Sequence, residues 1–577
     1  MDTKTIVETK SIELNLENGY TLTSGEKIPA ITVAYESYGE LNEAADNAIF
    51  ICHALTGDAH AAFYHDGDEK PGWWDPLIGP GKAMDTDRYY IVCANILSGC
   101  KGTTGPASIN PETGTAYATD FPLVSIKDVV NIQRLLLEQL TVKKLKTVIG
   151  GSLGGMQALE WACSHSDYIE SCICIAAGVS ISPQALAFDV IARQEIEHDP
   201  DWSNGNYYDG SSKPDKGLSH ARQIGHITYQ SSASMELKFG RDQRDAETGV
   251  ERSKFNTDFQ VESYLNHQGN KFVNRFDANS YLYITRMMDM FDLEDEYGSI
   301  ENAFENSDCK FLLVSISSDW LFPPEQQVDI VKALINTRKS VSYFNIDSDA
   351  GHDAFLLEHQ IISKGVAAFI SDADKDIASS QRQDLDNISK LLTKDQWVLD
   401  VGSGNGEFMY ALQNKKHIDG ICVDNDFEMV VACMNKGLNA LHMDADVCLN
   451  SFRDNSFDCV LMNQTIQQLQ STLQTLKQLL RLAPEGIISF PNFALYKYRF
   501  QLFFSGTLPV SDSLPYEWYD TPNIHVITIK DFLSLCRTNH IDIKEIKYLA
   551  DSSLANCLIS IGLKNIGAER AVVKIGR

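Results

Sequence analysis

The feature that most constrains this chain is a glycine-rich turn at residues 150–155 (GGSLGG), which joins a β-branched run to a helical pattern. Residues 147–149 (TVI) are typical of a short buried strand, and apolar residues recur at helical spacing from Leu153 onward. Ser152 stands at the tip, between glycines that allow strand and helix to pass closely. The pattern predicts a nucleophile elbow, in which strained backbone presents a serine hydroxyl.

Glycine-rich strand–helix turns also bind phosphate or simply permit tight packing, so the elbow needs support from elsewhere in the chain. Residues 311–316 and 341–346 are each typical of a buried strand, with Asp319 just past the first and His352 just past the second. An acid and a histidine at these positions complete the order serine, acid, histidine. We therefore predict a catalytic triad of Ser152, Asp319 and His352.

Two backbone N–H groups are expected to stabilise the negative charge that develops during attack by the serine. Leu153 begins the helix after Ser152, so its amide points toward a developing oxyanion. The second donor is expected in the loop after the strand at residues 48–52, where Leu55 or Thr56 precedes a glycine. His53 and His60 lie in the same loop, but no carboxylate or cysteine stands at ligand spacing. We therefore expect no metal there.

The alternation of strands and helices predicts an α/β fold, with a mostly parallel sheet covered by helices on both faces. The alternation stops at about residues 182–294, where helices and polar loops predict a lid that builds a substrate tunnel. A polar stretch at residues 371–384 is typical of a linker. The expected organisation is therefore a hydrolase-like domain at 1–370 and a second domain at 385–577.

The second domain opens with WVLDVGSGNGE at residues 397–407, a strand, a glycine turn and the start of a helix. Gly402, Gly404 and Gly406 would let a nucleotide-like ligand approach the backbone. Strand-like segments follow at residues 421–424, 443–446 and 457–462. The series is typical of a Rossmann-like domain that binds S-adenosylmethionine, with Asp424 and Asp444 as further candidate contacts.

Composition excludes several classes of partner. The chain has 577 residues and a formal charge of −29, which argues against nucleic acid and requires local donors for any anionic ligand. No apolar run approaches the roughly 20 residues of a membrane span, and the N-terminal residues contain no apolar signal core. The thirteen cysteines form no CxxC pair and lie mostly in strand-like runs. We expect a cytoplasmic protein with reduced thiols.

Residues of about 10–370 resemble the homoserine O-acyltransferases of methionine biosynthesis, a family of the α/β-hydrolase superfamily. The motifs that carry the resemblance are HALTGDAH (53–60), CANILSGCKGTTGPASINP (93–111), GGSLGG (150–155), ARQIGHITY (221–229), VESYLNHQGNKFVNRFDANSYLYITRM (261–287) and GHDAFL (351–356). The resemblance implies that Arg222 grips the carboxylate of L-homoserine. It also implies that Asp353 meets the amino group, and that Tyr229 lies in the same pocket. An acyl-CoA co-substrate and a homodimer formed through the lid are further implications.

Residues of about 385–577 resemble the methionine biosynthesis protein MetW, through DNSFD (454–458), SFPNF (489–493) and LPYEWYDTPNIH (514–525). The implied ligand is S-adenosylmethionine. One departure concerns the acid that usually follows the second strand and holds the ribose hydroxyls, because Cys422 replaces it. Asp424 lies two positions further on. The first loop also reads GSGNG, where GCGDG is usual.

These observations predict an acyltransferase that works through an acyl-enzyme and forms O-acetyl-L-homoserine from acetyl-CoA. Succinyl-CoA as donor and serine as acceptor remain alternatives on the same fold. Another alternative is an esterase fused to an active methyltransferase. The second domain has three candidate roles, namely methyl transfer, ligand sensing and partner binding.

Overall fold

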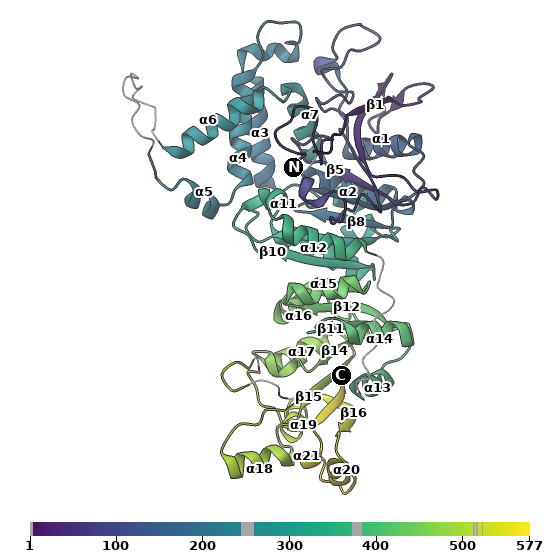
Figure 1. Ribbon diagram of the computed structural model, residues 1–577, viewed down its shortest axis with the longest axis vertical. Coiled ribbons are helices and arrows are strands. Elements are labelled where there is room, and N and C mark those ends of the chain that lie inside the picture. Colours follow the sequence, from purple (N-terminus) through teal and green to yellow (C-terminus); the bar gives the residue numbers. More distant parts are fainter. Residues whose placement is uncertain (1–3, 244–258, 372–382, 512–513, 515–516, 522) are drawn as a thin grey trace. The chain divides into compact units, whose positions relative to one another are not determined.

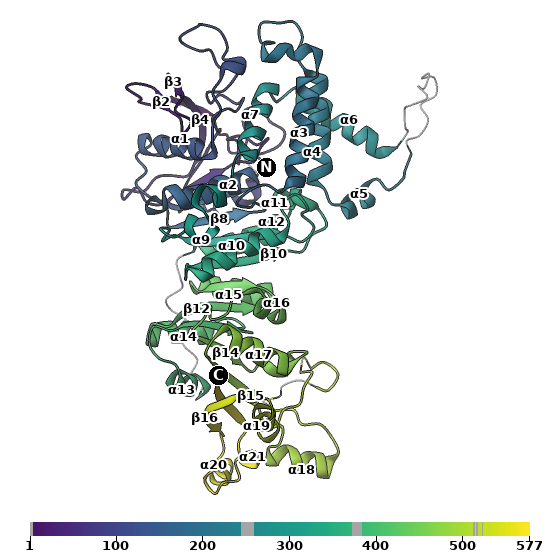
Figure 2. The ribbon, with the colours of Figure 1, turned by 180° about the vertical axis from the view of Figure 1, so that it is seen from behind.

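The computed structural model describes residues 4–243, 259–371, 383–511, 514, 517–521 and 523–577 (Figures 1 and 2). It contains two compact units. The first comprises the described residues up to 340 together with 345–370, and the second comprises 341–344 together with the described residues from 371 onward.

The first unit is built on a mixed sheet whose strands follow the order β1-β4-β6-β5-β7-β8-β9, and β10, of which only residues 345 and 346 belong to this unit, comes next in the order. The pairs β1–β4 and β4–β6 are antiparallel, while β6–β5, β5–β7, β7–β8 and β8–β9 are parallel. Every residue of β5 and β8 is buried, as expected for parallel strands covered on both faces. The strands are β1 (Lys10–Glu13), β4 (Thr32–Tyr38), β5 (Ala48–Cys52), β6 (Tyr90–Ala94), β7 (Leu145–Gly151), β8 (Ser171–Ile175), β9 (Lys310–Ile316) and β10 (Val341–Ile346).

Helices cover this sheet as the sequence predicted. α2 (Leu153–Ser164) packs on β5, β7 and β8, and α1 (Ile126–Gln139) packs against α2. α10 (Pro324–Asn336) contacts β9. The N-terminus of α1 carries a capping box in which Ser125 accepts from the N–H of Asp128 and the Asp128 carboxylate accepts from the N–H of Ser125.

A helical layer is inserted between β8 and β9, where the lid was expected. In Figure 1 its helices α3, α4 and α7 stand close together, and α4 contacts both α3 and α6. Residues 244–258 of the expected lid lie outside the described residues. Short helices continue to Ala303, beyond the expected end at residue 294. The helices are α3 (Pro183–Glu197), α4 (Asp215–Tyr229), α5 (Ser232–Lys238), α6 (Gln260–Val273), α7 (Ala278–Asp289), α8 (Leu293–Tyr297) and α9 (Ile300–Ala303).

The second unit contains a Rossmann-like sheet in the order β13-β12-β11-β14-β15-β17-β16. The pairs from β13 to β15 are parallel, and β17 runs antiparallel to both of its neighbours. The strand order reverses between β11 and β14, which is where open α/β sheets bind ligands. The strands are β11 (Trp397–Val401), β12 (Asp419–Asp424), β13 (Asn439–His442), β14 (Cys459–Asn463), β15 (Glu485–Pro491), β16 (Asp542–Leu549) and β17 (Arg570–Gly576).

Nine helices are described in this unit, and most of them connect successive strands. They are α13 (Gln383–Leu391), α14 (Glu407–Lys416), α15 (Phe427–Asn435), α16 (Ala445–Ser451), α17 (Thr472–Leu482), α18 (Tyr496–Ser505), α19 (Ile529–Thr538), α20 (Ser553–Ser560) and α21 (Lys564–Gly567).

Two expectations for this unit need correction. The predicted strand at residues 443–446 is wrong, since β13 is Asn439–His442 and Asp444 is the N-cap of α16. The Asp444 carboxylate accepts from the N–H of Asp446 at 2.8 Å, which satisfies a first-turn donor of the helix. Helix α13 begins at Gln383, inside the stretch expected to be linker, and residues 372–382 lie outside the description.

None of the helices in the described parts of the chain combines the length and apolarity that a membrane crossing requires. All thirteen cysteines are free thiols, and only Cys557 is exposed.

Candidate active site

The strand–helix turn at Ser152 has the geometry of a nucleophile elbow. Ser152 has φ 59° and ψ −128°, between the end of β7 and the first residue of α2. A Cβ on Gly150 would lie 2.2 Å from the carbonyl oxygen of Gly154, and a Cβ on Gly154 would lie 2.0 Å from that of Cys52. Both neighbours are backbone atoms and cannot move aside, so the glycines are required by close packing. The left-handed φ of a serine costs about 1–3 kcal/mol and is sustained by the surrounding structure.

His352 and Asp319 form a buried pair just beyond β10 and β9. Nδ1 of His352 donates to Oδ2 of Asp319 at 2.7 Å. The other oxygen of Asp319 accepts from the N–H groups of Leu321 and Phe322 at 2.9 Å each, so its orientation is held by backbone. Because Nδ1 carries the proton, Nε2 of His352 is the basic nitrogen. Nε2 is buried without a hydrogen-bond partner, and His352 lines the same cavity as Ser152.

The environment of His352 changes its basicity. Burial lowers the pKa of His352, but the charge of Asp319 and its hydrogen bond outweigh burial and raise the pKa above the ordinary value of 6.5. The imidazolium that would form on proton transfer is therefore stabilised by Asp319.

A small cavity of ≈ 100 Å³ collects most of the residues singled out in the sequence. Leu55 and Thr56 come from the loop after β5, and Arg222 and Tyr229 come from α4. Nη1 of Arg222 donates to Oγ1 of Thr56 at 3.3 Å. The remaining members of the set are Ser152, His352 and Asp353. Leu153 lies fully buried behind Ser152 at the first position of α2, where a backbone N–H has no partner within the helix.

A larger cavity of ≈ 510 Å³ adjoins the first and shares Ala54, Thr56, Arg222 and Leu356 with it. Arg275 and Lys271 add two cations to its lining. Nη1 of Arg275 donates to the carbonyl oxygen of Thr56 at 3.1 Å. The guanidinium carbons of Arg222 and Arg275 lie 4.8 and 5.4 Å from the Phe272 ring centroid.

Burial and the charge of Arg222 both lower the pKa of Arg275. Asp58 lines the larger cavity as well, and its charge partly offsets this by raising the pKa of Arg275. Within the part of the chain that the structure describes, neither these arginines nor Lys271 forms an ion pair with a carboxylate. Sequence reasoning did not single out Lys271, near the end of α6, or Arg275, in the turn after it, since neither stands at a recognisable spacing.

One further carboxyl in the small cavity was missed. Asp189 of α3 lines it, and burial together with the charge of Asp289 raises the pKa of Asp189 to about 7. Asp289 in turn pairs with Arg193. An aspartate within a lid helix carries no signal in the sequence, because its burial depends on the packing of α3 against α7.

In the second unit, the glycine loop after β11 has the expected form. Gly402, Gly404 and Gly406 have φ values of 71°, 54° and 74°. Oδ2 of Asp424 accepts from the N–H of Gly404 at 2.8 Å, so the carboxylate contacts the loop itself. Asp444 differs, since its carboxylate caps α16. Cys422, at the usual position of the ribose acid, is buried.

Asp400, in β11 beside this loop, also went unrecognised. It is buried, and its Oδ1 has no hydrogen-bond partner. Burial and the charge of Asp424 raise its pKa to about 7.

The sheet, the elbow and the buried His352–Asp319 pair define an α/β-hydrolase, and a family model described as "alpha/beta hydrolase fold" matches residues 47–359. A second model, "Methionine biosynthesis protein MetW", matches residues 382–575. The chain is 39% identical to the bifunctional methionine biosynthesis protein MetXA/MetW of Rhodopirellula baltica, over 98% of this chain and 93% of that protein. The chain therefore belongs to the MetXA/MetW family, in which a homoserine O-acetyltransferase-type domain precedes a MetW domain.

Further relatives match the first unit. A homoserine O-acetyltransferase of Methanosalsum zhilinae is 51% identical over 63% of this chain and 73% of its own length. The solved homoserine O-acetyltransferase of Bacillus anthracis superposes with a TM-score of 0.60 at 30% identity, covering 64% of this chain and 98% of that one. Esterase E22 superposes with a TM-score of 0.58 at 28% identity, covering 63% and 100%. Similarity of fold alone thus does not separate acyl transfer from ester hydrolysis.

The Asp319–His352 pair predicts a specific pH dependence. Neutral His352 is the reactive form, so kcat/KM for acyl transfer should fall on the acid side with a midpoint above pH ~6.5. In Asp319→Asn the midpoint should move to lower pH, and kcat should drop by about 10⁴-fold because the tautomer is no longer held. The exposed Asp349→Asn serves as the control and should keep the wild-type profile. An acid limb at the same pH in wild type and Asp319→Asn would show that Asp319 does not set the basicity of His352.

Proposed function

We propose that the first unit transfers the acetyl group of acetyl-CoA to the hydroxyl of L-homoserine through an acyl-enzyme on Ser152. This proposal rests on one observation in a chain of this family. One cavity is lined by Ser152, His352, Arg222 and Asp353. A nucleophile with its base would suffice for an esterase. A half-buried cation and a carboxylate beside them suit an amino-acid acceptor.

The first half-reaction needs only groups already in place. Nε2 of His352 takes the proton of the Ser152 hydroxyl while the serine oxygen attacks the thioester carbonyl. The backbone N–H groups of Leu55 and Leu153 stabilise the oxyanion. When the C–S bond breaks, His352 returns the proton to the thiolate and CoA leaves. In the second half-reaction His352 takes the proton of the homoserine hydroxyl while the hydroxyl oxygen attacks the ester carbonyl. His352 then returns the proton to the Ser152 oxygen as the bond between that oxygen and the acyl carbon breaks.

Recognition of the acceptor is assigned to the two charged residues of the small cavity. The Arg222 guanidinium binds the homoserine carboxylate, and the Asp353 carboxylate binds the ammonium group. Burial raises the pKa of Asp353, with the charges of His352 and Arg222 opposing it, and an ammonium at contact distance favours the ionised form. Tyr229 lies near Arg222 and the catalytic base, with its ring centroid 5.5 Å from the Arg222 guanidinium and 6.2 Å from the His352 ring.

Recognition of the donor is assigned to the larger cavity. The phosphates of CoA carry the negative charge that Arg275 and Lys271 lack as a partner, and the chain's overall charge of −29 would otherwise repel them. The small cavity favours acetyl over succinyl, because a second carboxylate would lie near Asp189 and Asp353.

We also propose that the chain is a homodimer through the lid. Apolar side chains on its outer surface support this, namely Leu186, Val190 and Ile191 of α3 and Ile227 of α4, which are 37–49% exposed. Sedimentation velocity of the full chain would reveal a monomer if the proposal is wrong.

The acyl-enzyme is tested with Ser152→Ala. Wild-type protein mixed with acetyl-CoA alone should release one equivalent of CoA and gain an acetyl group on Ser152, visible by intact-mass spectrometry. Ser152→Ala should show neither, with a loss of turnover of about 10⁶-fold. Steady CoA release that does not increase with homoserine would identify a thioesterase and contradict the transferase proposal.

Substitutions of Arg222 and Arg275 should affect different half-reactions. Arg222→Gln should acylate Ser152 normally but transfer to homoserine about 10- to 100-fold more slowly, as expected for a charged contact of about 1.5–3 kcal/mol. Arg275→Gln should raise the KM for acetyl-CoA and leave that for S-acetylpantetheine, which lacks the phosphates, unchanged. Lys213→Gln, an exposed lid lysine, is the control. Equal losses in both half-reactions for both variants would place the two arginines in the scaffold.

For the second unit we propose reversible binding of S-adenosylmethionine that modulates the acyltransferase. The left-handed glycine loop and the unpartnered buried Asp400 support a ligand at this loop. Cys422 at the place of the ribose acid suits weaker binding than a methyltransferase uses. Tethering supplies an effective concentration of roughly millimolar, so the coupling needs no tight interface.

Calorimetry with and without homoserine tests this role. S-adenosylmethionine should bind saturably. Homoserine should change the Kd of S-adenosylmethionine, and S-adenosylmethionine should change the Kd of homoserine by the same factor, because coupling is reciprocal. Asp424→Ala should lose the binding and the exposed Asp386→Ala should keep it. Absence of binding at millimolar ligand, or binding indifferent to homoserine, would rule out the sensor role.

A further inference from the structure

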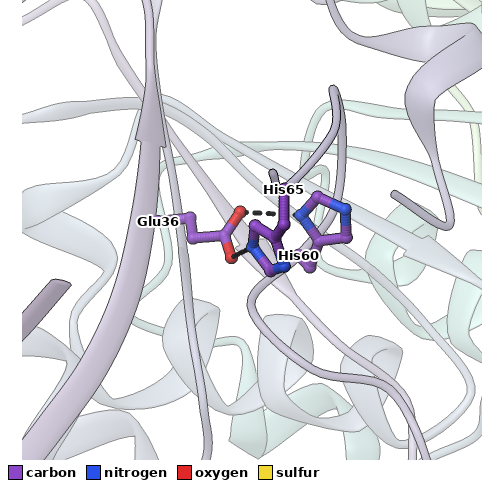
Figure 3. Close-up of side chains that lie close together, drawn as sticks. All are labelled: Glu36, His60 and His65. Carbon is purple, nitrogen blue, oxygen red and sulfur yellow. Dashed lines mark hydrogen bonds and ion pairs between the residues drawn. The ribbon is translucent and has the colours of Figure 1, made fainter. Parts of the chain in front are cut away.

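A buried carboxylate and two histidines meet beside the first sheet, and none of the three has been given a role above (Figure 3). Glu36 lies on β4 and is fully buried. His60 and His65 come from the loop that begins with the predicted oxyanion residues. Nδ1 of His60 lies 3.0 Å from Oε2 of Glu36, and Nε2 of His65 lies 2.8 Å from Oε1. The two imidazole rings stack with centroids 3.8 Å apart.

These contacts define the tautomers of both histidines. A carboxylate only accepts, so His60 donates through Nδ1 and His65 donates through Nε2. Thr9 and Tyr38 also donate to Glu36, at 2.8 and 2.9 Å, and complete its acceptor capacity. The opposite nitrogens, Nε2 of His60 and Nδ1 of His65, are therefore left with free lone pairs.

Both free nitrogens face the same carboxylate oxygen. Oδ2 of Asp68 lies 3.7 Å from Nε2 of His60 and 3.7 Å from Nδ1 of His65. These separations are too long for hydrogen bonds, and Nε2 of His60 is buried without a partner. Two ligand atoms bound to one tetrahedral zinc at about 2.0–2.1 Å lie about 3.3–3.4 Å apart. Asp68 is thus within a few tenths of an ångström of a shared ligand position.

We propose that Nε2 of His60, Nδ1 of His65 and the Asp68 carboxylate bind a divalent transition-metal ion, with Zn²⁺ as the expected ion and water in the fourth position. Two imidazoles and one carboxylate form a ligand set that zinc uses elsewhere. Glu36 then acts as the carboxylate behind the ligands, holding the second nitrogen of each histidine and fixing its orientation. His53 takes no part, because Nδ1 contacts the carbonyl of Ala54 and Nε2 accepts from the N–H of Ile96.

A proton is the competing occupant. Burial lowers the pKa of His60, but the hydrogen bond and charge of Glu36 outweigh this and raise it. Oδ2 of Asp68 accepts instead from the backbone N–H of His65, at 3.3 Å. A metal ion would bind both free nitrogens and Asp68 at once, whereas one proton can bridge only one histidine to Asp68.

The ion would stabilise the conformation of the loop that carries His60, His65 and Asp68. Asp68 also accepts through its backbone carbonyl from Lys4 at 2.7 Å, and Glu36 accepts from Thr9. The N-terminal segment, β4 and the loop after the oxyanion residues therefore converge on this point. His60 also lines the larger cavity that was assigned to CoA. The expected contribution is stability of this loop, without direct contact to the reacting atoms.

The test uses the full chain after chelator treatment, titrated with Zn²⁺ by calorimetry and with Co²⁺ by visible spectroscopy. One equivalent should bind, Co²⁺ should give the absorption of a four-coordinate nitrogen–oxygen site without a thiolate charge-transfer band, and Zn²⁺ should raise Tm. His65→Ala and Asp68→Asn should each weaken binding by at least about 10-fold. The exposed His220→Ala and Asp66→Asn are matched controls and should bind as wild type.

Equal Zn²⁺ affinity in wild type, His65→Ala and Asp68→Asn would overturn the proposal, as would a Co²⁺ spectrum dominated by thiolate ligands. Lack of saturable binding would overturn it as well. Because the readouts are binding, spectrum and Tm, the outcome is independent of which acyl group or acceptor the first unit uses.

Discussion

The position of Ser152 depends on how closely β7, α2 and β5 approach one another. The backbone of Gly154 passes the carbonyl of Cys52 at a distance that leaves no room for a Cβ, and Gly150 faces Gly154 in the same way. These contacts turn the chain sharply enough to hold a serine in left-handed backbone at the end of a parallel strand. The neighbouring strand ends supply Asp319 and His352, so sheet topology assembles what is dispersed over 200 residues of sequence.

The lid also sets the electrostatics of the two cavities. The lid brings two guanidiniums and a lysine to the cavities of a strongly acidic chain, and their partners are absent among the described carboxylates. Like charges held close together cost stability, and an anionic ligand would offset that cost. Homoserine and CoA each supply such an anion. Asp353 and Asp189 line the small cavity together with Arg222, so carboxyl groups and a guanidinium share it.

The loop that carries Leu55 and Thr56 is anchored from two sides. Arg222 and Arg275 both donate to Thr56, and the Glu36–His60–His65 cluster holds the loop further along. The donors expected to stabilise the oxyanion therefore lie between a substrate-binding region and a rigid polar cluster. Preorganisation of this kind is what makes backbone N–H groups effective against developing charge.

The sequence by itself determined the elements that obey local rules. The elbow followed from glycine spacing, the strands from β-branched runs, and the glycine loop of the second unit from its position after a strand. Asp319 and His352 could be predicted because parallel strands bring their carboxyl ends to one edge. The strand placed at residues 443–446 was wrong because Asp444 is a helix cap, and a single aspartate after a short strand does not show which side of the boundary it occupies.

Tertiary structure alone decided the features that depend on contacts between residues distant in the sequence. His60 offered no ligand pattern in its own stretch, yet the pairing of β4 with β6 and the path of the following loop place Glu36, His65 and Asp68 around it. Arg275 and Asp189 gain their significance from burial and from charged neighbours, and Lys271 gains it from its place in the lining of the larger cavity. Burial changes the free energy of a charge by an amount that no residue type encodes, so these groups became visible only once the helices had packed.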